Sequence, residues 1–234
     1  MLSGDQFLMQ AFIDKLDFHS YVAKQMFNLP VEVDKVKSVY PNERQYAKAI
    51  TFGIMYQAGP AKIAETVNKD AKEGEGITSA MAKQFIAKYF REASKLKRFI
   101  DSSNSQIESK QYIYSFFGRK RRLPEAKSPN RGVAQHAIRS GVNFLVQSVA
   151  SDINVMGVID LVKWIEDNGY DEDIKPFTVV HDSIVSEVRE DLVDEYVKNA
   201  KECIQRDRGL TIPGCPIKVD FEVGPSWGEL TDYD

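Results

Sequence analysis

Residues 44–56 of the chain read RQYAKAITFGIMY and contain its most regular pattern of charged and aromatic side chains. Four of these side chains recur at every fourth position: Arg44, Lys48, Phe52 and Tyr56. On a helix each such step turns only about 40° around the axis, so the four would form one stripe, cationic and then aromatic. Basic side chains bind phosphate oxygens and an aromatic ring offers a face to a sugar or base, so the stripe suits a nucleoside triphosphate. The alternative is an ordinary amphipathic helix with solvated basic residues and core aromatic residues.

Start and stop signals predict that this helix covers residues 42–57. Asn42 is a good N-cap, and Gln45, three residues later, can complete an arrangement like a capping box. Gly59 tolerates the left-handed geometry of a helix end, and Pro60 cannot continue the hydrogen-bond ladder. Gly53 costs about 1 kcal/mol of helix stability relative to Ala, so we expect another group to approach the backbone there.

A second polar stripe lies on the longest predicted helix, residues 133–167. Arg139, Asn143 and Gln147 recur at every fourth position among mostly apolar neighbours. Each can donate hydrogen bonds, and donors on one face suit the acceptors that every base pair presents in the minor groove. A polar stripe satisfied within the protein is the alternative interpretation.

A candidate metal ligand lies between two β-prone runs, residues 177–180 and 184–188. They predict a hairpin over residues 177–188 with His181, Asp182 and Ser183 at its tip. We expect both strands to be buried, so that they hold Asp182 rigidly. Mg²⁺ commonly takes one or two carboxylates together with substrate phosphates. A turn Asp that bonds only to local backbone is the competing interpretation.

The remaining periodicity predicts a mixed α and β chain. Two short helices are expected in the first forty residues, and further helices over residues 61–68, 79–101 and 191–206. The aromatic run 111–117 predicts a strand followed by a tight basic turn over residues 118–122. Residues 217–223 predict a final strand.

Composition and charge limit the function classes. The chain has 234 residues with 43% hydrophobic and 28% charged, which excludes fibrous, low-complexity and wholly disordered proteins. No run approaches the roughly 18 consecutive apolar residues of a membrane helix, so a soluble, cytoplasmic protein is expected.

Cys203 and Cys215 have no metal-ligand spacing and are interpreted as ordinary thiols. The net charge of −3 conceals a segment of about +6 at residues 106–139, suited to phosphates, and one of about −8 at residues 165–198.

The order of these motifs resembles the family A DNA polymerases, the family of bacterial polymerase I. Residues 44–56 match the form R-x3-K-x3-F-G-x2-Y of the family's motif B, a helix of its fingers region. Val180-His181-Asp182-Ser183 is similar to motif C, normally His-Asp-Glu, on the palm hairpin. Residues 118–124 and the helix with Arg139 lie between them in the family's order, and Asp17-Phe18-His19 precedes motif B.

The resemblance implies a role for each matching residue. On the nucleotide, His19, Arg44 and Lys48 would bind the triphosphate, Phe52 would stack on the sugar, and Tyr56 would close the nascent base pair. Towards the DNA, the implied residues are Arg119, Arg139, Asn143 and Gln147. His181 would lie near the primer end and Asp182 would bind the catalytic Mg²⁺ ions, which makes Lys48, His181 and Asp182 the implied catalytic residues.

The implied fold is α+β, part of a right-hand polymerase. Residues 1–105 would form a helical fingers region, and residues 106–234 a palm region with an antiparallel sheet. The implied reaction is template-directed transfer of a nucleotide from a dNTP to a primer 3′-hydroxyl by two Mg²⁺ ions. The implied partners are primer–template DNA and dNTPs.

Two departures from the family pattern limit this expectation. Ser183 stands where the family usually has Glu, which should tune the metal site without removing its main ligand. The motif A strand, which carries another metal-binding Asp, would fall before residue 1, and no thumb sequence is present. One carboxylate cannot hold two Mg²⁺ ions in reactive geometry, so the isolated chain should be inactive.

Three interpretations of this gap remain open. The chain is the C-terminal subunit of a split polymerase, for example from a bacteriophage in its host's cytoplasm, completed by a polypeptide with motif A and thumb. Alternatively, it is a non-catalytic remnant that binds nucleotide or DNA. The third interpretation is a truncated polymerase.

Overall fold

The computed structural model describes residues 2–69, 76–210 and 217–233, in two compact units. The units comprise Met1–Leu145 and Val146–Asp234, and the division falls inside one helix, α8 (Arg131–Asn168). The border between fingers and palm that the resemblance implies, at residues 105 and 106, stays a prediction. The architecture is mostly helical with three two-stranded antiparallel sheets among the described residues, which confirms the α+β class.

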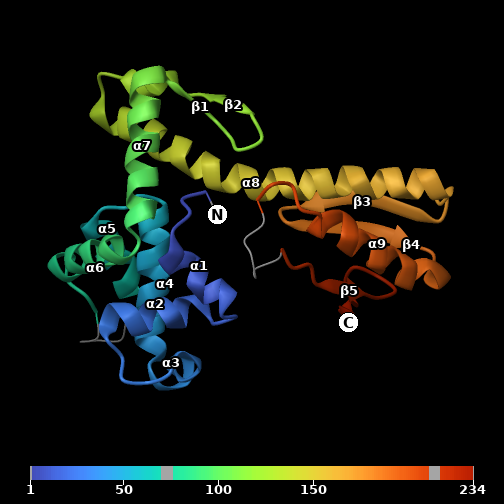
Figure 1. The fold of residues 1–234 in the computed structure, drawn as a ribbon, viewed down its shortest axis with the longest axis horizontal. Helices are drawn as coiled ribbons and strands as arrows, with labels where there is room; N and C mark the ends of the chain where they lie inside the picture. The colour runs from blue at the N-terminus through green and yellow to red at the C-terminus, as the bar shows by residue number, and fades with distance from the viewer. Residues whose placement is uncertain (1, 70–75, 211–216, 234) are drawn as a thin grey trace. The chain divides into compact units, whose positions relative to one another are not determined.

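Helices dominate the first unit (Figure 1). In chain order they are α1 (Gln6–Ile13), α2 (Phe18–Phe27), α3 (Val33–Val39), α4 (Pro41–Met55), α5 (Pro60–Lys69), α6 (Ser79–Glu92) and α7 (Ser94–Lys110), followed by the start of α8. The two helices predicted in the first forty residues are confirmed as α1 and α2, and a third helix, α3, also forms there. The single helix predicted over residues 79–101 is divided at Ala93, whose non-helical backbone ends α6 and precedes α7.

The centre of this unit is α4, which packs against α2, α3, α5 and α6. Its inward face carries Ile50 and Ile54, which lie in one apolar cluster with Val22 of α2, Ile63 of α5 and Tyr89 of α6. Because neighbours cover one side of α4, its opposite side is the one available to a ligand.

A short basic hairpin follows α7. It pairs β1 (Tyr112–Tyr114) with β2 (Lys120–Arg122), and η1 (Pro124–Lys127) leads on to α8. The strand predicted over residues 111–117 is therefore shorter, and part of the predicted basic turn is itself a strand. Gly118 has φ of +84° in the connection, a conformation that favours glycine.

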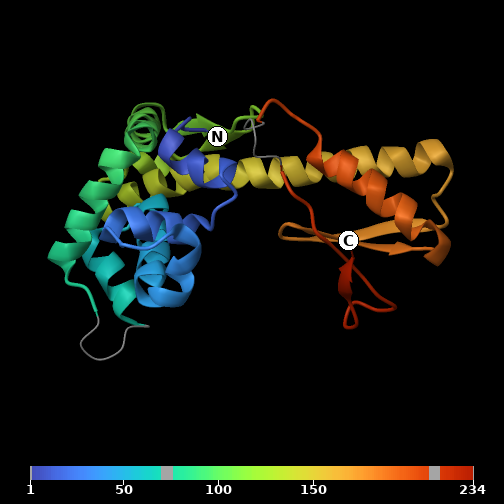
Figure 2. The ribbon, with the colours of Figure 1, turned by 60° about the horizontal axis from the view of Figure 1, so that its bottom comes forward.

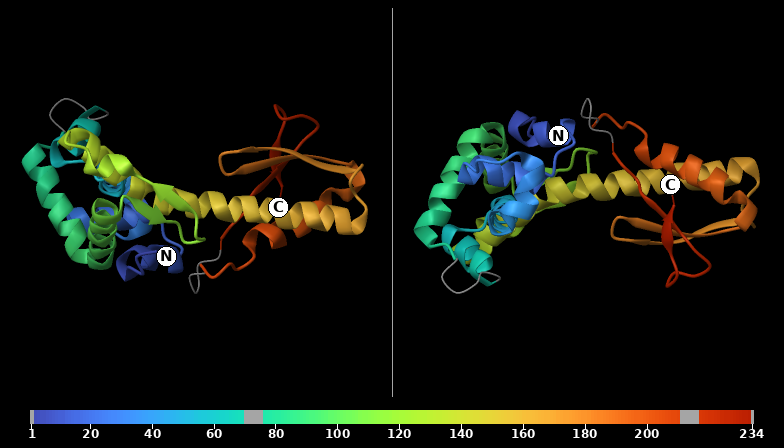
Figure 3. Two further views of the ribbon diagram at one scale, coloured as in Figure 1. Left: turned by 90° about the horizontal axis from the view of Figure 1, so that it is seen from above. Right: turned by 90° about the horizontal axis from the view of Figure 1, so that it is seen from below.

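The second unit is built on the C-terminal part of α8. Two further strands, β3 (Ile174–Val180) and β4 (Ser183–Val188), form the predicted hairpin, and α9 (Val193–Gln205) follows η2 (Glu190–Leu192). Figures 2 and 3 show α9 and this hairpin beside α8. Leu161 and Ile165 of α8 form a small core with Ile174 and Ala200. The last pair is β5 (Phe221–Val223) with β6 (Thr231–Tyr233), so the strand predicted over residues 217–223 is confirmed only at its end.

The long predicted helix is confirmed as α8, one or two residues longer at each end. Among the described residues it is also the one helix long and apolar enough to cross a membrane, with a window of mean hydropathy 1.4. Core helices pass the same test, and Ile138, Val142, Leu145 and Val149 of α8 are buried, so this is weak evidence for a membrane span.

Candidate functional site

The ends of α4 differ from their predicted form. The N-cap is Tyr40, without a side-chain cap bond, and Pro41 occupies the first turn, so the predicted cap at Asn42 is wrong. Pro suits this position because its missing N–H would have no helical acceptor there. At the other end Gln57, not Gly59, takes the left-handed backbone, with φ of +53°. The Ala58 N–H donates to the Gly53 carbonyl at 2.7 Å and closes the helix end.

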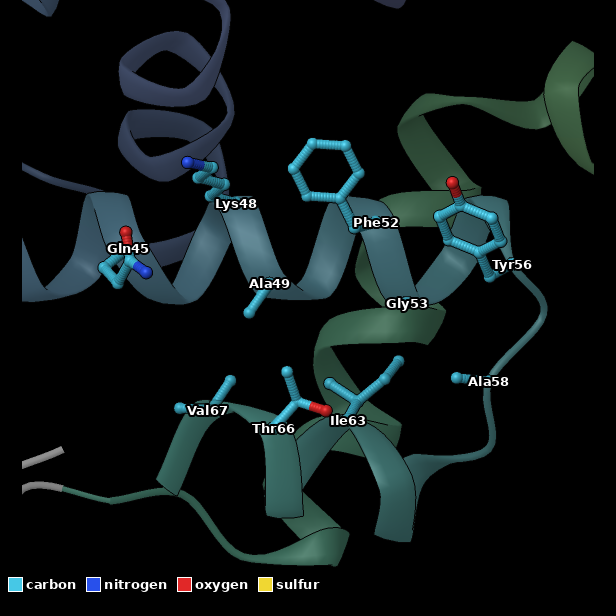
Figure 4. A pocket seen from close by; sticks show the side chains of 10 residues that line it. All are labelled: Gln45, Lys48, Ala49, Phe52, Gly53, Tyr56, Ala58, Ile63, Thr66 and Val67. Carbon is cyan, nitrogen blue, oxygen red and sulfur yellow. The ribbon is translucent and has the colours of Figure 1, made fainter. Parts of the chain in front are cut away.

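The stripe of residues 44, 48, 52 and 56 lies on the accessible side of α4, as Figure 4 shows for its last three members. Phe52 is 48% exposed and Tyr56 is 50% exposed, so neither aromatic ring belongs to the core. Lys48 is exposed as well. The interpretation of these aromatic residues as core residues is therefore wrong, and the stripe is open to a ligand.

Gly53 allows α5 to approach α4 closely. A Cβ at this position would lie 2.5 Å from Cγ1 of Ile63, far inside normal contact distance. The expectation that a group approaches the backbone here is confirmed, and the group is a side chain of the protein itself. A pocket of about 340 Å³ lies beside this contact, and Figure 4 shows Thr66 and Val67 on its α5 side opposite Ala49.

Arg44 is held by the residue that caps α2. Its Nε and Nη2 atoms donate to Oδ1 and Oδ2 of Asp17, each at 2.9 Å. Asp17 Oδ1 also accepts the backbone N–H of Ser20 at 2.8 Å, as the N-cap of α2. The bond to Arg44 holds the pKa of the Asp17 carboxyl well below its usual range, so this pair is fully charged at neutral pH.

His19 lies beside the stripe because α2 packs against α4. Its ring centroid is 5.8 Å from that of Phe52. Burial lowers the pKa of His19, and the nearby cations Arg44 and Lys48 lower it further against the effect of Asp17. The structure thus brings together His19, Arg44, Lys48 and Phe52, with the imidazole neutral at pH 7.

The second stripe is only partly accessible. On α8, Arg139 and Asn143 are half-buried and Gln147 is exposed. Next to it, the guanidinium of Arg119 lies 5.7 Å from the ring centroid of Phe144. This surface therefore presents cationic and amide donors.

The sequence analysis gave no individual role to Lys120 and Arg121 of the β1–β2 hairpin. Arg121 lies 5.4 Å from the Phe144 ring and donates from Nη2 to Ser140 Oγ at 2.8 Å, which ties β2 to α8. Lys120 Nζ lies 3.9 Å from the ring centroid of Tyr112 across the β1–β2 pair. Aromatic residues on β1 opposite basic residues on β2 were the signal that could have identified the Lys120 contact, whereas the Arg121 contacts to α8 have no such local signal.

The predicted hairpin tip is formed by a two-residue turn. His181 and Asp182 connect Val180 to its partner Ser183, and His181 has φ of +57°. Such left-handed backbone is unusual for a residue other than glycine. His181, Asp182 and Ser183 are all exposed, so the tip presents its polar groups outward.

The strands that carry this tip are not buried as expected. Phe177 is 60% exposed, Val179 43% and Val180 38%. Only the far end of the hairpin, at Ile174, joins the core of the second unit. An apolar strand surface that remains exposed next to a polar tip is typical of a surface that another segment covers.

Asp182 alone does not make a metal centre. Within the described ranges, no group of three His, Cys, Asp or Glu residues could hold a metal ion. A single exposed carboxylate fits Mg²⁺ as one ligand of several, because this ion also accepts substrate phosphates and water.

Cys203 is buried, and burial raises the pKa of its thiol. Cys215 lies outside the described residues.

Comparisons with known proteins give one consistent result. The model of DNA polymerase family A matches residues 1–229. The chain is 46% identical to the DNA polymerase of Escherichia phage T5, over 95% of this chain and 28% of that protein. It is 30% identical to the thermostable DNA polymerase I of Thermus filiformis, over 97% of this chain and 25% of that protein.

A solved structure agrees with these relatives. The POL domain of Pol1 from M. smegmatis, in complex with DNA primer-template and dNTP, matches with a TM-score of 0.77 and 27% identity. The match covers 93% of this chain and 35% of that one. The chain thus spans about a quarter of the length of the curated relatives cited here. Because the family model matches nearly all of its residues, the chain belongs to DNA polymerase family A.

Proposed function

We propose that this chain forms the nucleotide-binding and primer-terminus-binding part of a template-directed DNA polymerase. The observation that carries the proposal is the accessible stripe on α4, with Lys48, Phe52 and Tyr56 on one side of the helix and His19 of α2 beside it. The M. smegmatis structure of similar fold, a complex with DNA primer-template and dNTP, supports the proposal.

Each part of the stripe meets a different part of the nucleotide. Arg44 and Lys48 bind the triphosphate, because both are cationic and both lie at the N-terminal half of the stripe. His19 adds a hydrogen bond from the neighbouring helix. Phe52 stacks on the sugar, and Tyr56, at the end of α4, closes the nascent base pair.

The DNA contacts come from α8 and the basic hairpin. Arg139 and Gln147 donate to the minor-groove edges of primer and template, which tests pairing geometry without reading sequence. Asn143 lies between them and supports both. Arg119 contributes a phosphate contact from the β1–β2 connection.

Asp182 would be one of the ligands that hold Mg²⁺ in this reaction, and His181 is its neighbour at the hairpin tip. The bound ions would activate the primer 3′-hydroxyl and stabilise the leaving pyrophosphate. The second carboxylate of this site comes from outside these 234 residues, from another part of a longer chain or from a separate polypeptide with motif A and thumb. The exposed strand residues Phe177, Val179 and Val180 support such a covering segment. We place the activity in the cytoplasm, that of the host if the gene is a phage gene.

The experiment that tests this function is nucleotide binding by the chain itself. Titration calorimetry with dATP should detect binding to the wild-type chain, and Lys48→Ala should weaken it about tenfold by removing one charge-assisted contact. Lys37→Ala is the matched control, because Lys37 is an exposed lysine on α3, and it should leave the affinity unchanged. Equal loss in both variants would refute a specific triphosphate site on α4.

The complete reaction needs a second experiment. Primer extension with Mg²⁺ should be absent for the chain alone and should appear when a polypeptide with motif A and thumb is added or fused. Activity of the chain alone would refute the need for a second carboxylate. Binding of dATP without activity in any completed enzyme would favour the non-catalytic remnant.

A further inference from the structure

The ion pair between Asp17 and Arg44 has a more defined geometry than an ordinary surface ion pair. Both carboxylate oxygens accept from the same guanidinium, at 2.9 Å each, so the pair is bidentate. Asp17 itself is fixed, because its Oδ1 also accepts the N–H of Ser20 in the first turn of α2. The N-terminus of α2 therefore fixes the position of the Arg44 side chain on α4.

The bonds to Asp17 use one edge of the guanidinium and leave the other. Arg offers five N–H donors in one plane, and Asp17 takes the Nε hydrogen and one hydrogen of Nη2. The adjacent terminal edge, formed by Nη1 and the second hydrogen of Nη2, is a second two-donor fork. Such a fork matches a phosphate group, which accepts two parallel hydrogen bonds. The Arg44 side chain is 23% exposed, which leaves room for that contact.

We propose that Asp17 is a positioning residue, which holds one edge of the Arg44 guanidinium so that the other edge binds the phosphates of the nucleotide. This inference rests on the proposed function of α4. Arg44 is ordered before the nucleotide arrives, so less side-chain entropy is lost on binding. Asp17 stays bonded to Arg44 in the complex and does not compete with the phosphates.

A single substitution of Asp17 would not isolate this effect. Asp17→Asn removes a negative charge near the triphosphate, which strengthens binding, and it also frees Arg44, which weakens binding. The two effects oppose each other. A cycle that keeps the charge at position 44 constant separates them, because Arg44→Lys removes the fork and retains the cation.

The experiment measures dATP and inorganic tripolyphosphate binding by calorimetry, in the wild-type chain, Arg44→Lys, Asp17→Asn and the double variant. In the wild-type background Arg44→Lys should lower affinity about tenfold, the value of one charge-assisted hydrogen bond. In the Asp17→Asn background the same change should cost about twofold or less, because an Arg that is not held must lose more side-chain entropy to present its fork to the phosphate. An equal cost in both backgrounds would overturn the proposal.

The control is a carboxylate of the same kind away from the stripe. Glu32, which precedes α3, forms an ion pair with Lys24 of α2 at 3.2 Å. Glu32→Gln therefore also removes a carboxylate that is paired across two helices. The cost of Arg44→Lys should stay about tenfold in that background. Asn is a good N-cap, so Asp17→Asn should keep α2 folded, and circular dichroism checks this.

A measurement on the unmutated chain tests the proposal even if a variant misfolds. By NMR, the Arg44 Nε–H should exchange slowly with solvent before tripolyphosphate is added, because it is bonded to Asp17. The exchange should stay equally slow afterwards. Loss of that protection on binding would show that phosphate displaces Asp17 and would overturn the proposal. If the wild-type chain binds neither ligand, the proposed function itself fails, which is a different result from binding without coupling.

Discussion

The contact between Gly53 and Ile63 gives the sharpest prediction, because two principles predict opposite signs for Gly53→Ala. Ala in a helix is more favourable than Gly by about 1 kcal/mol, so propensity alone predicts stabilisation. The new Cβ, however, would lie 2.5 Å from Cγ1 and 2.8 Å from Cδ1 of Ile63. Carbon atoms normally rest about 3.5–4.0 Å apart. Ile63 is 1% exposed, so it cannot turn aside into solvent.

The clash should exceed the gain in propensity. Overpacking of a buried contact costs about 1–3 kcal/mol, so we expect a net destabilisation of about 1 kcal/mol for Gly53→Ala. Urea unfolding followed by circular dichroism measures the free energy of unfolding. Hydrogen exchange of the α4 and α5 amides shows whether the loss is localised there.

A double-variant cycle separates the clash from other effects. Ile63→Ala alone should cost about 2–5 kcal/mol through the cavity it leaves. Combined with Gly53→Ala it should cost less than the sum, because the new methyl group enters part of that cavity. Stabilisation by Gly53→Ala, or strict additivity of the two changes, would refute the close packing of α5 on α4.

Further predictions concern the proposed reaction and its pH dependence. In a completed polymerase, Asp182→Asn should reduce turnover in primer extension by several orders of magnitude while DNA affinity, measured by anisotropy, stays nearly constant; near-normal turnover would refute the metal role. Phe52→Tyr should increase incorporation of dideoxynucleotides, as the family resemblance implies, and unchanged discrimination would mean that α4 does not lie over the sugar. Burial keeps the pKa of His19 low, so a bound triphosphate, which favours the protonated imidazole, should bind more tightly as pH falls from about 7.5 to about 6. His19→Gln should remove that dependence, and a wild-type affinity independent of pH would contradict the contact. The pKa of Asp17 is lowered in the folded chain, so its stabilising effect is present above the unfolded value of about 3.9 and is lost as pH falls below it. The free-energy cost of Asp17→Asn should therefore shrink in acid, by no more than about 1 kcal/mol for so exposed a pair, and a constant cost would count against the ion pair.

The site on α4 could be predicted from sequence because its side chains follow one helical period. A spacing of four residues places Arg44, Lys48, Phe52 and Tyr56 along one side of a helix whatever surrounds it. The period cannot say which side faces solvent, and the exposure of Phe52 and Tyr56 decides that question. The close approach at Gly53 was predictable as well, whereas its partner Ile63 depends on tertiary packing.

Helix ends and strand burial were harder to predict, for a physical reason. Gln57 adopts the left-handed backbone that local rules assign to glycine, and its side-chain Oε1 accepts a hydrogen bond from Asn104 Nδ2 of α7 at 3.0 Å. A contact across 47 positions of sequence helps to hold that conformation, and no local pattern contains it. Val179 and Val180 are β-branched and therefore favour a strand, but strand propensity does not say what covers the strand.

The same distinction explains why the two proposed sites differ in completeness. The nucleotide site draws its residues from α4 and from α2, which packs directly against it, so the chain itself assembles His19, Arg44, Lys48 and Phe52. A metal site needs several oxygen ligands, and among the described residues Asp182 belongs to no group of three His, Cys, Asp or Glu residues that could hold a metal ion. Two hydrogen bonds between Arg44 and Asp17 also fix one cation of the first proposed site. Nucleotide binding should therefore be measurable in this chain alone, while bond formation should require the segment that brings the second carboxylate to the exposed side of the β3–β4 hairpin.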